Sequence, residues 1–272
     1  MFKDPKILNQ INQLGFVLID AKMIHETDKL NSFLIDNFRF QTPDFYYSLL
    51  ENNFSQNKVI GNTLSEVLNQ FYQNFFTEIK ILNQSFLSKP ANSKEELLLH
   101  QDWCYTDNKK YSSYNIWIPL TDTTEKNGAM FFIPGSHLWF DNIISASLPT
   151  ARISTSKFPS SKIHSVSVKK GQVLIFHPAV FHGSFPNFSE KNRIVVTSTI
   201  LQKNAPFLYF HQSEIKDEVR VFSLEEDAFL KDLKSLAMGG APTSKEIKRI
   251  KYLHSIITEQ ELKLKIFSQQ KL

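Results

Sequence analysis

From residue 97 the sequence reads LLLHQDWCYTDNKKYSSYNIWIPL (97–120), in which two short apolar or alternating runs flank a polar turn. Runs of the same kind follow at AMFFIP (129–134), VSV (166–168), QVLIF (172–176) and RIVVTSTI (193–200). Turn-forming residues such as Asn127 and Gly128 separate them. Short strands divided in this way are typical of an antiparallel sandwich or barrel. We therefore predict a β core over about residues 80–201.

The flanks of this core have the pattern of helices. Asp4 and Pro5 open a short helix that Gly15 closes, and GFVLID (15–20) predicts a strand. Apolar residues three and four apart predict further helices over 25–38, 64–79, 224–237 and 244–267, with an uncertain loop over 41–62. The Ser-, Thr-, Pro- and Lys-rich stretch 141–162 predicts a long inserted loop. We expect one domain, 1–272, with a helical N-terminal region (1–79) and a helical C-terminal extension (202–272).

Composition excludes several classes of protein. Apolar residues make up 42% of the 272 residues and Phe alone accounts for 24, which excludes a disordered chain. The net charge of +4 is scattered, unlike the basic face of a nucleic-acid-binding protein. A single cysteine, Cys104, fits a reducing compartment, and neither a signal-like N-terminus nor a long apolar run is present. We expect a cytoplasmic monomer or homodimer that acts on a small molecule, without nucleic acid or membrane as partner.

His100 and Asp102 are the first candidates for chemistry. Residues two apart in a strand point to the same face, so an imidazole and a carboxylate would project together. Such a pair can occupy two adjacent positions around one metal ion. On its own the His-x-Asp pattern is also that of a polar strand end with a His–Asp hydrogen bond.

A third ligand must come from a distant strand. His182 follows the apolar run QVLIFHPAVF (172–181) and precedes Gly183, where a strand gives way to a turn. His177 competes with it but stands directly before Pro178. Two histidines and one carboxylate on one side of a metal leave the other positions open, which is the arrangement of non-haem Fe(II) oxygenases.

Arg193 opens the strand RIVVTSTI (193–200) and shares one face with Val195, Thr197 and Thr199. A charged residue on the inner face of a β core is costly unless it is paired. A dicarboxylate cosubstrate would supply the partner, because guanidinium binds carboxylate through two hydrogen bonds. The alternative is that Arg193 points outward at the strand start.

In HQDW (100–103), NIWIPLTDTTEKNGAMFFIPGSH (115–137), GQVLIFHPAVFHGS (171–184) and the Asn187–Arg193 spacing, the chain resembles the phytanoyl-CoA dioxygenase family of 2-oxoglutarate oxygenases. The resemblance covers about residues 97–200. It implies a double-stranded β-helix (a jelly roll, as in cupins) buttressed by helices, with Fe(II), 2-oxoglutarate and O2 as cofactor and cosubstrates. The residues that match family positions are His100, Asp102 and His182 for iron, Arg193 and Ser184 for 2-oxoglutarate, and Trp117 or Asn115 for the cosubstrate pocket.

The resemblance also indicates which type of oxidation to expect. Relatives that halogenate carry a small residue in place of the carboxylate, whereas this chain keeps Asp102, so hydroxylation or a related oxidation is expected. Two other classes stay open: a metal-free β-helix binding module, and a cupin-like metalloenzyme that does not use 2-oxoglutarate. The substrate does not follow from the sequence, because the family's scaffold hosts many substrates.

Overall fold

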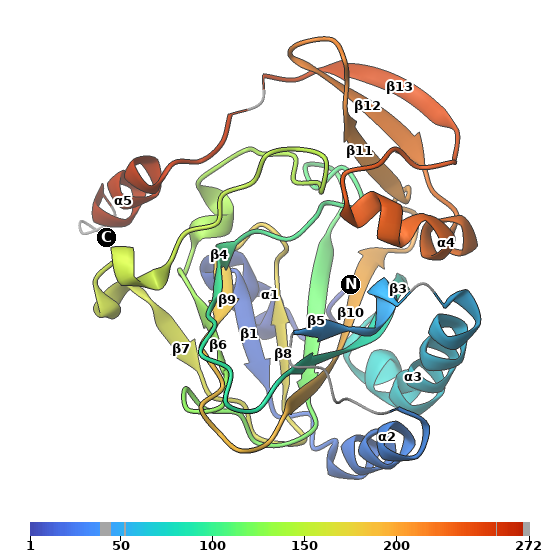
Figure 1. Cartoon of the computed structure of the whole chain (residues 1–272), viewed down its shortest axis with the longest axis vertical. Coiled ribbons are helices and arrows are strands. Elements are labelled where there is room, and N and C mark those ends of the chain that lie inside the picture. Colours follow the sequence, from blue (N-terminus) through green and yellow to red (C-terminus); the bar gives the residue numbers. More distant parts are fainter. Residues whose placement is uncertain (39–44, 52, 254, 269–272) are drawn as a thin grey trace.

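Two antiparallel sheets form the centre of the molecule in the computed structural model, which describes residues 1–38, 45–51, 53–253 and 255–268 (Figure 1). The larger sheet has the strand order β1 (Phe16–Ile19), β8 (Val173–Phe176), β5 (Ser113–Pro119), β10 (Arg193–Gln202), β3 (Ile79–Lys89) and β2 (Tyr46–Tyr47). The smaller sheet has the order β4 (Leu97–His100), β9 (His182–Ser184), β6 (Met130–Phe132) and β7 (His164–Val166).

The two sheets face each other across an apolar interior. One buried cluster combines Trp117 and Val195 of the larger sheet with Met130 and Phe132 of the smaller one. This is the predicted double-stranded β-helix, and every predicted run of the β core overlaps a strand. The run 166–168 is the poorest match, because β7 ends at Val166 and Val168 forms only an isolated bridge with Thr123.

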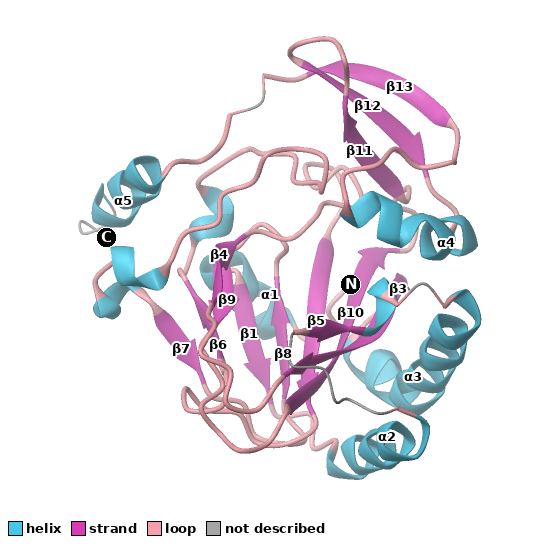
Figure 2. Cartoon of the chain, viewed as in Figure 1, coloured by secondary structure: helices cyan, strands magenta, loops and turns pink. Residues whose placement is uncertain are grey.

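Helices cover the outer face of the larger sheet (Figure 2). They are α1 (Pro5–Leu14), α2 (Ile24–Asn37) and α3 (Phe54–Phe75). Their apolar residues pack on the side chains that alternate outward from β3, β5, β8 and β10, Phe86 and Ile116 among them. As the sequence indicates, the Asp4 side chain caps α1 by accepting from the Lys6 N–H, and Gly15 ends it with a φ of 85°.

Helix α3 begins ten residues earlier than predicted, inside the stretch 41–62 for which the sequence predicts a loop. Asn53 caps it by accepting from the Gln56 N–H, and Ile60, Leu64 and Leu68 continue one buried stripe. It also ends before the predicted residue 79, because the backbone adopts an extended conformation at Phe76. Residues 41–44 and 52 of the predicted loop lie outside the described residues.

The predicted helical C-terminal extension is wrong over much of its length. Residues 202–272 contribute a three-stranded sheet of β11 (Leu208–Gln212), β12 (Glu218–Ser223) and β13 (Glu246–Lys251), together with α4 (Glu226–Ala237) and α5 (Glu259–Ser268). The prediction of one helix over 244–267 failed because the two isoleucines of β13 form no packed stripe: Ile247 is exposed and only Ile250 is half-buried. Cross-strand ion pairs of Arg220 with Glu246 and of Arg249 with Glu218 stabilise β13 as a strand.

The inserted loop 141–162 is confirmed as mainly irregular, with the short 3-10 turns η3 (Thr155–Lys157) and η4 (Ser160–Lys162). Two further 3-10 turns are η1 (Ser48–Leu50) and η2 (Ser136–Leu138). Within the described ranges, none of the helices has the length and apolar character needed to cross a membrane.

Candidate active site

His100 and His182 lie directly opposite each other on neighbouring strands of the smaller sheet. His100 ends β4 and His182 begins β9, and the register pairs the two residues. Their ring centroids are 4.4 Å apart. Burial of His182 is nearly complete, since only 3% of its surface is exposed.

Asp102 completes the group from just beyond the end of β4. Its backbone N–H donates to Pro178 O at 2.8 Å, and the Gln101 side chain donates to Ala179 O at 2.6 Å, so the turn before β9 holds this segment. One carboxylate oxygen lies 3.5 Å from His100 Nε2 and the other 3.4 Å from His182 Nε2. One potential ligand atom from each of the three residues lies within 4.8 Å of the others. We call His100, Asp102 and His182 the acceptor cluster.

The hydrogen bonds of the two imidazoles fix what this cluster can bind. His100 Nδ1 lies 2.7 Å from Leu98 O, and His182 Nδ1 lies 2.9 Å from Val180 O. A carbonyl only accepts, so each Nδ1 carries a proton, and Nε2 is the nitrogen that each ring turns toward Asp102 and can offer to a metal. His182 is buried and His100 and Asp102 are half-buried, and three such groups with converging lone pairs repel one another unless a cation lies among them. The donor set therefore fits a divalent metal ion.

The protonation states agree with this fit. Burial, followed by the neighbouring charge of His182, lowers the pKa of His100 and keeps its imidazole neutral. Burial by itself raises the pKa of Asp102, but the charge of His182 and the contacts with both imidazoles outweigh it and lower the pKa well below its ordinary value. A neutral imidazole and an ionised carboxylate are the forms that bind metal.

Asn115 orients the carboxylate from the larger sheet. Its Nδ2 donates to Asp102 Oδ2 at 2.6 Å, and its Oδ1 accepts from the Thr199 hydroxyl at 2.9 Å. Asn115 and Thr199 are register partners on β5 and β10. The residue predicted for the cosubstrate pocket thus contacts a member of the acceptor cluster directly.

A second charged group lies at the start of β10. Arg193 is only 3% exposed, so it points inward as the strand pattern predicts, and its guanidinium lies 5.5 Å from the Trp117 ring. Burial lowers the pKa of Arg193 to about 10. Arg193 Nε has no hydrogen-bond partner in the described part of the chain, and the same holds for the buried Ser184 Oγ.

Lys89 is a functional candidate that the sequence reasoning missed. It lies opposite Arg193 in the β3–β10 register, is 3% exposed, and donates to the carbonyl oxygens of Glu95, Ser184 and Phe185. Burial, and then the charge of Arg193, lower the pKa of Lys89 to about 7. The signal that could have found it is its place two residues after Leu87 in an alternating run.

We call Lys89, Ser184 and Arg193 the donor cluster. Among the described residues, no Asp or Glu forms an ion pair with Lys89 or Arg193, although each is almost fully buried. Two buried cations side by side are costly without an anion. Ser184 is two residues from His182 on β9, about 7 Å along the strand, which is comparable with the length of a five-carbon dicarboxylate.

Other candidates lie elsewhere. His177 packs against His137 at 5.3 Å between ring centroids, and burial lowers its pKa to about 4. It is therefore not part of the acceptor cluster. Burial also raises the pKa of Cys104 to about 11, so its thiol is unreactive.

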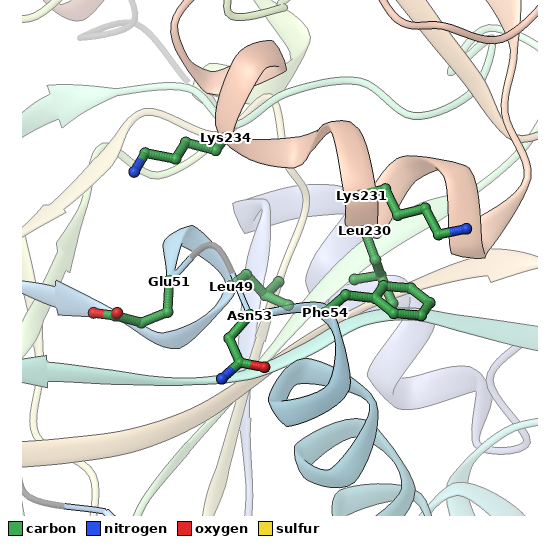
Figure 3. A pocket seen from close by; sticks show the side chains of 7 residues that line it. All are labelled: Leu49, Glu51, Asn53, Phe54, Leu230, Lys231 and Lys234. Atoms are coloured by element: carbon green, nitrogen blue, oxygen red, sulfur yellow. The ribbon is translucent and has the colours of Figure 1, made fainter.

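A surface pocket between the start of α3 and helix α4 is also separate from the acceptor cluster (Figure 3). The residues that line it are Leu49, Glu51, Asn53, Phe54, Leu230, Lys231 and Lys234. Lys231 Nζ lies 5.1 Å from the centre of the Phe54 ring, a contact that joins the two helices. None of the seven residues belongs to either cluster. The pocket therefore lies between two helices and outside the candidate active site.

Comparison with known proteins is consistent with this geometry. A phytanoyl-CoA dioxygenase of Arabidopsis thaliana is 28% identical over 121 residues, which are 42% of this chain and 41% of that protein. A probable alpha-ketoglutarate-dependent hypophosphite dioxygenase of Stutzerimonas stutzeri is 25% identical over 199 residues, 69% of this chain and 66% of that protein. The matched segments thus span between two fifths and two thirds of these relatives.

Among solved structures, the non-heme alpha ketoglutarate dependent epimerase SnoN from nogalamycin biosynthesis has the same fold, with a TM-score of 0.53 and 17% identity over 91% of this chain and 94% of that one. The model of the phytanoyl-CoA dioxygenase (PhyH) family matches residues 17–195, which hold both clusters. This chain therefore belongs to the phytanoyl-CoA dioxygenase (PhyH) family.

Proposed function

We propose that this chain is an Fe(II)- and 2-oxoglutarate-dependent dioxygenase that hydroxylates a small organic molecule. The observation that carries the proposal is the pairing of the two clusters inside one barrel. The acceptor cluster offers three lone pairs to a cation, and the donor cluster offers two positive charges and a free hydroxyl to an anion.

The residues have separate tasks in this proposal. His100, Asp102 and His182 hold Fe(II), while Leu98 O and Val180 O keep the imidazoles in the tautomer that binds metal. When bound, Fe(II) and 2-oxoglutarate together supply the oxidising chemistry, in which O2 gives one oxygen atom to the substrate and one to succinate, with release of CO2.

The donor cluster positions the cosubstrate. Arg193 binds its distal carboxylate and the Ser184 hydroxyl donates to the same group. Lys89 adds positive charge from behind, since its ammonium is already bonded to three carbonyls. Trp117, Val195 and the other apolar residues between the sheets exclude water, which strengthens these electrostatic contacts.

The experiment is to mix the metal-free protein anaerobically with Fe(II) and 2-oxoglutarate and to record the visible spectrum. We expect a charge-transfer band that His100→Ala and Asp102→Ala abolish. The matched control is His177→Gln, which alters a buried histidine outside the acceptor cluster and should keep the band. A wild-type protein without a band, or a band unchanged in His100→Ala, contradicts the proposal.

Hydroxylation is tested separately, because one solved structure with the same fold is an epimerase. Candidate compounds are screened for stimulated succinate release, and the mass of the product formed from each active compound is measured by mass spectrometry. We expect a product that is heavier than the substrate by one oxygen atom derived from O2. A product of unchanged mass would point to epimerisation, and a loss of two hydrogens to desaturation.

A further inference from the structure

The larger sheet is irregular at one point. Thr197 of β10 lies opposite Ser85, but Thr199, two residues on, lies opposite Leu82, so β3 carries one residue more than its partner. Asn83 lies within this bulge with a φ of 54°, in the left-handed region. Left-handed backbone costs free energy in a residue other than glycine, and bulges near active sites re-aim side chains.

The bulge separates Asn83 from the side chains that face the helices. Its neighbour Gln84 donates to the Tyr72 hydroxyl on α3 at 3.4 Å. The side chain of Asn83 instead contacts the hydroxyl of Tyr105, which follows Asp102 by three residues. The irregularity in β3 therefore turns an amide toward the segment that carries the carboxylate ligand.

A second set of contacts joins the bulge to the acceptor cluster. Thr199, the residue at which the register shifts, donates to Asn115, and Asn115 donates to Asp102. Asn83 thus adjoins the surroundings of Asp102 both through Tyr105 and through Thr199. A group bound at Asn83 would lie beside the proposed iron site.

Asn83 is equipped to bind a ligand there. It is 7% exposed, and its Oδ1 has no hydrogen-bond partner among the described residues. The hydroxyl of the fully buried Ser85, two residues along β3, contacts the Tyr47 hydroxyl instead. A buried acceptor without a donor costs about 1–3 kcal/mol, so an incoming N–H or O–H is favoured.

The charge around this site selects against anions. The phenols Tyr47 and Tyr105 border it. Asp102 acts on both of them, and Tyr47 and Tyr209 act on Tyr105 as well. No Lys or Arg of the described chain acts on either phenol. A carboxylate or phosphate there would place its charge against the Asn83 carbonyl oxygen, with no lysine or arginine to pair with it.

We propose that Asn83 and Tyr105 form the substrate-recognition subsite, and that this subsite takes an uncharged group bearing an N–H or O–H, such as a primary amide or an alcohol. The inference rests on the proposed function, which places the oxidation beside Asp102. Tyr105 stacks edge-on against Phe207 at 5.8 Å and Phe229 at 5.5 Å between ring centroids, so the wall of the subsite is aromatic. An apolar body attached to the uncharged group is therefore expected.

The test uses four probes with one aromatic body: hydrocinnamamide, hydrocinnamyl alcohol, hydrocinnamate and hydrocinnamyl phosphate. Each is titrated by calorimetry into the protein loaded anaerobically with Fe(II) and 2-oxoglutarate. We expect the amide and the alcohol to bind about tenfold more tightly than the two anions, the difference that one satisfied buried hydrogen bond makes. Asn83→Gly keeps the left-handed backbone and should remove this preference.

The matched control is Asn92→Gly, which alters an exposed asparagine with nearly the same φ of 55° and should change nothing. Tighter or equal binding of an anion, unchanged amide affinity in Asn83→Gly, or no binding of the neutral probes at about millimolar concentration overturns the subsite. The charge-transfer band recorded before each titration separates the two ideas. Its absence overturns the proposed function and the subsite together, whereas a normal band without the expected preference overturns the subsite alone.

Discussion

The acceptor cluster and the donor cluster both lie inside one barrel, yet they are built in different ways. The acceptor cluster lies on the smaller sheet, where the backbone of β4 and β9 places His100 opposite His182. The donor cluster joins the two sheets, because Lys89 and Arg193 come from the larger sheet and Ser184 from β9. Strand β9 contributes to both.

The difference teaches how one interior can hold both a cation and an anion. Each cluster alone would be destabilised, since lone pairs repel in one and positive charges repel in the other. The two-residue period of β9 sets His182 and Ser184 on one face, about 7 Å apart. A ligand that chelates the metal at one end and carries a carboxylate at the other satisfies both clusters.

The sharpest way to break this comparison is Arg193→Leu. We expect 2-oxoglutarate affinity to fall by about 100-fold, or roughly 3 kcal/mol, because a buried charge pair loses one partner. Fe(II) binding, measured by metal analysis after anaerobic reconstitution, should stay unchanged. Arg220→Leu, which removes an arginine paired with Glu246 on β12, is the control. Unaltered 2-oxoglutarate binding would favour a cupin-like metalloenzyme instead.

Gly183→Ala tests the dependence of the acceptor cluster on backbone spacing. A Cβ at Gly183 would lie 2.2 Å from Leu97 O and 2.6 Å from the Phe131 ring, so β4 and β9 must separate. We expect the free energy of unfolding in denaturant to fall by about 2–3 kcal/mol, with weaker metal binding.

Gly61→Ala is the matched control for that substitution, because nothing lies within 4 Å of its Cβ position in α3. It should raise stability by about 0.5–1 kcal/mol through helix propensity. Equal effects of the two substitutions would show that β4 and β9 have room to adjust.

The substitution Asn115→Ala tests whether Asn115 supports the acceptor cluster or the cosubstrate pocket. Because its amide orients Asp102, we expect Fe(II) affinity to fall by about tenfold, as for other residues that hold metal ligands in place. Thr199→Val, one hydrogen bond further from the metal ligand, should have a smaller effect. A loss of 2-oxoglutarate affinity with normal Fe(II) affinity would instead assign Asn115 to the cosubstrate pocket.

Lys89→Met gives the smallest effect and tests the charge of the donor cluster. The pKa of Lys89 is about 7 in the folded chain and 10.5 ordinarily, so between these values the unfolded chain binds more protons and stability rises with pH. From pH 7 to about pH 8.5 the unfolding free energy without 2-oxoglutarate should rise by on the order of 1 kcal/mol.

Chemical denaturation at several pH values measures this slope, and Lys89→Met should flatten it. The range stays below 9.0, the ordinary pKa of a cysteine such as Cys104. A flat wild-type profile would show that Lys89 keeps its proton in the folded protein over this pH range, as an exposed lysine does.

Local patterns in the sequence were enough to predict most strands of the β core and the inward direction of Arg193. Alternation depends only on neighbouring residues, so it is readable without a structure. The same patterns gave a wrong element or a wrong boundary in two places. The isoleucines of β13 fit a helix, and the start of α3 depends on the Asn53 cap and on packing against the sheet.

By itself, the sequence predicted most strands of the core and selected His100, Asp102, His182 and Arg193 as candidate binding residues, because side-chain identity and period are local properties. Tertiary structure alone decided that Lys89 lies beside Arg193, that Asn115 holds Asp102, and that Asn83 turns toward Tyr105. These contacts depend on the register between strands far apart in the chain. A shift of one residue would send each side chain to the opposite face.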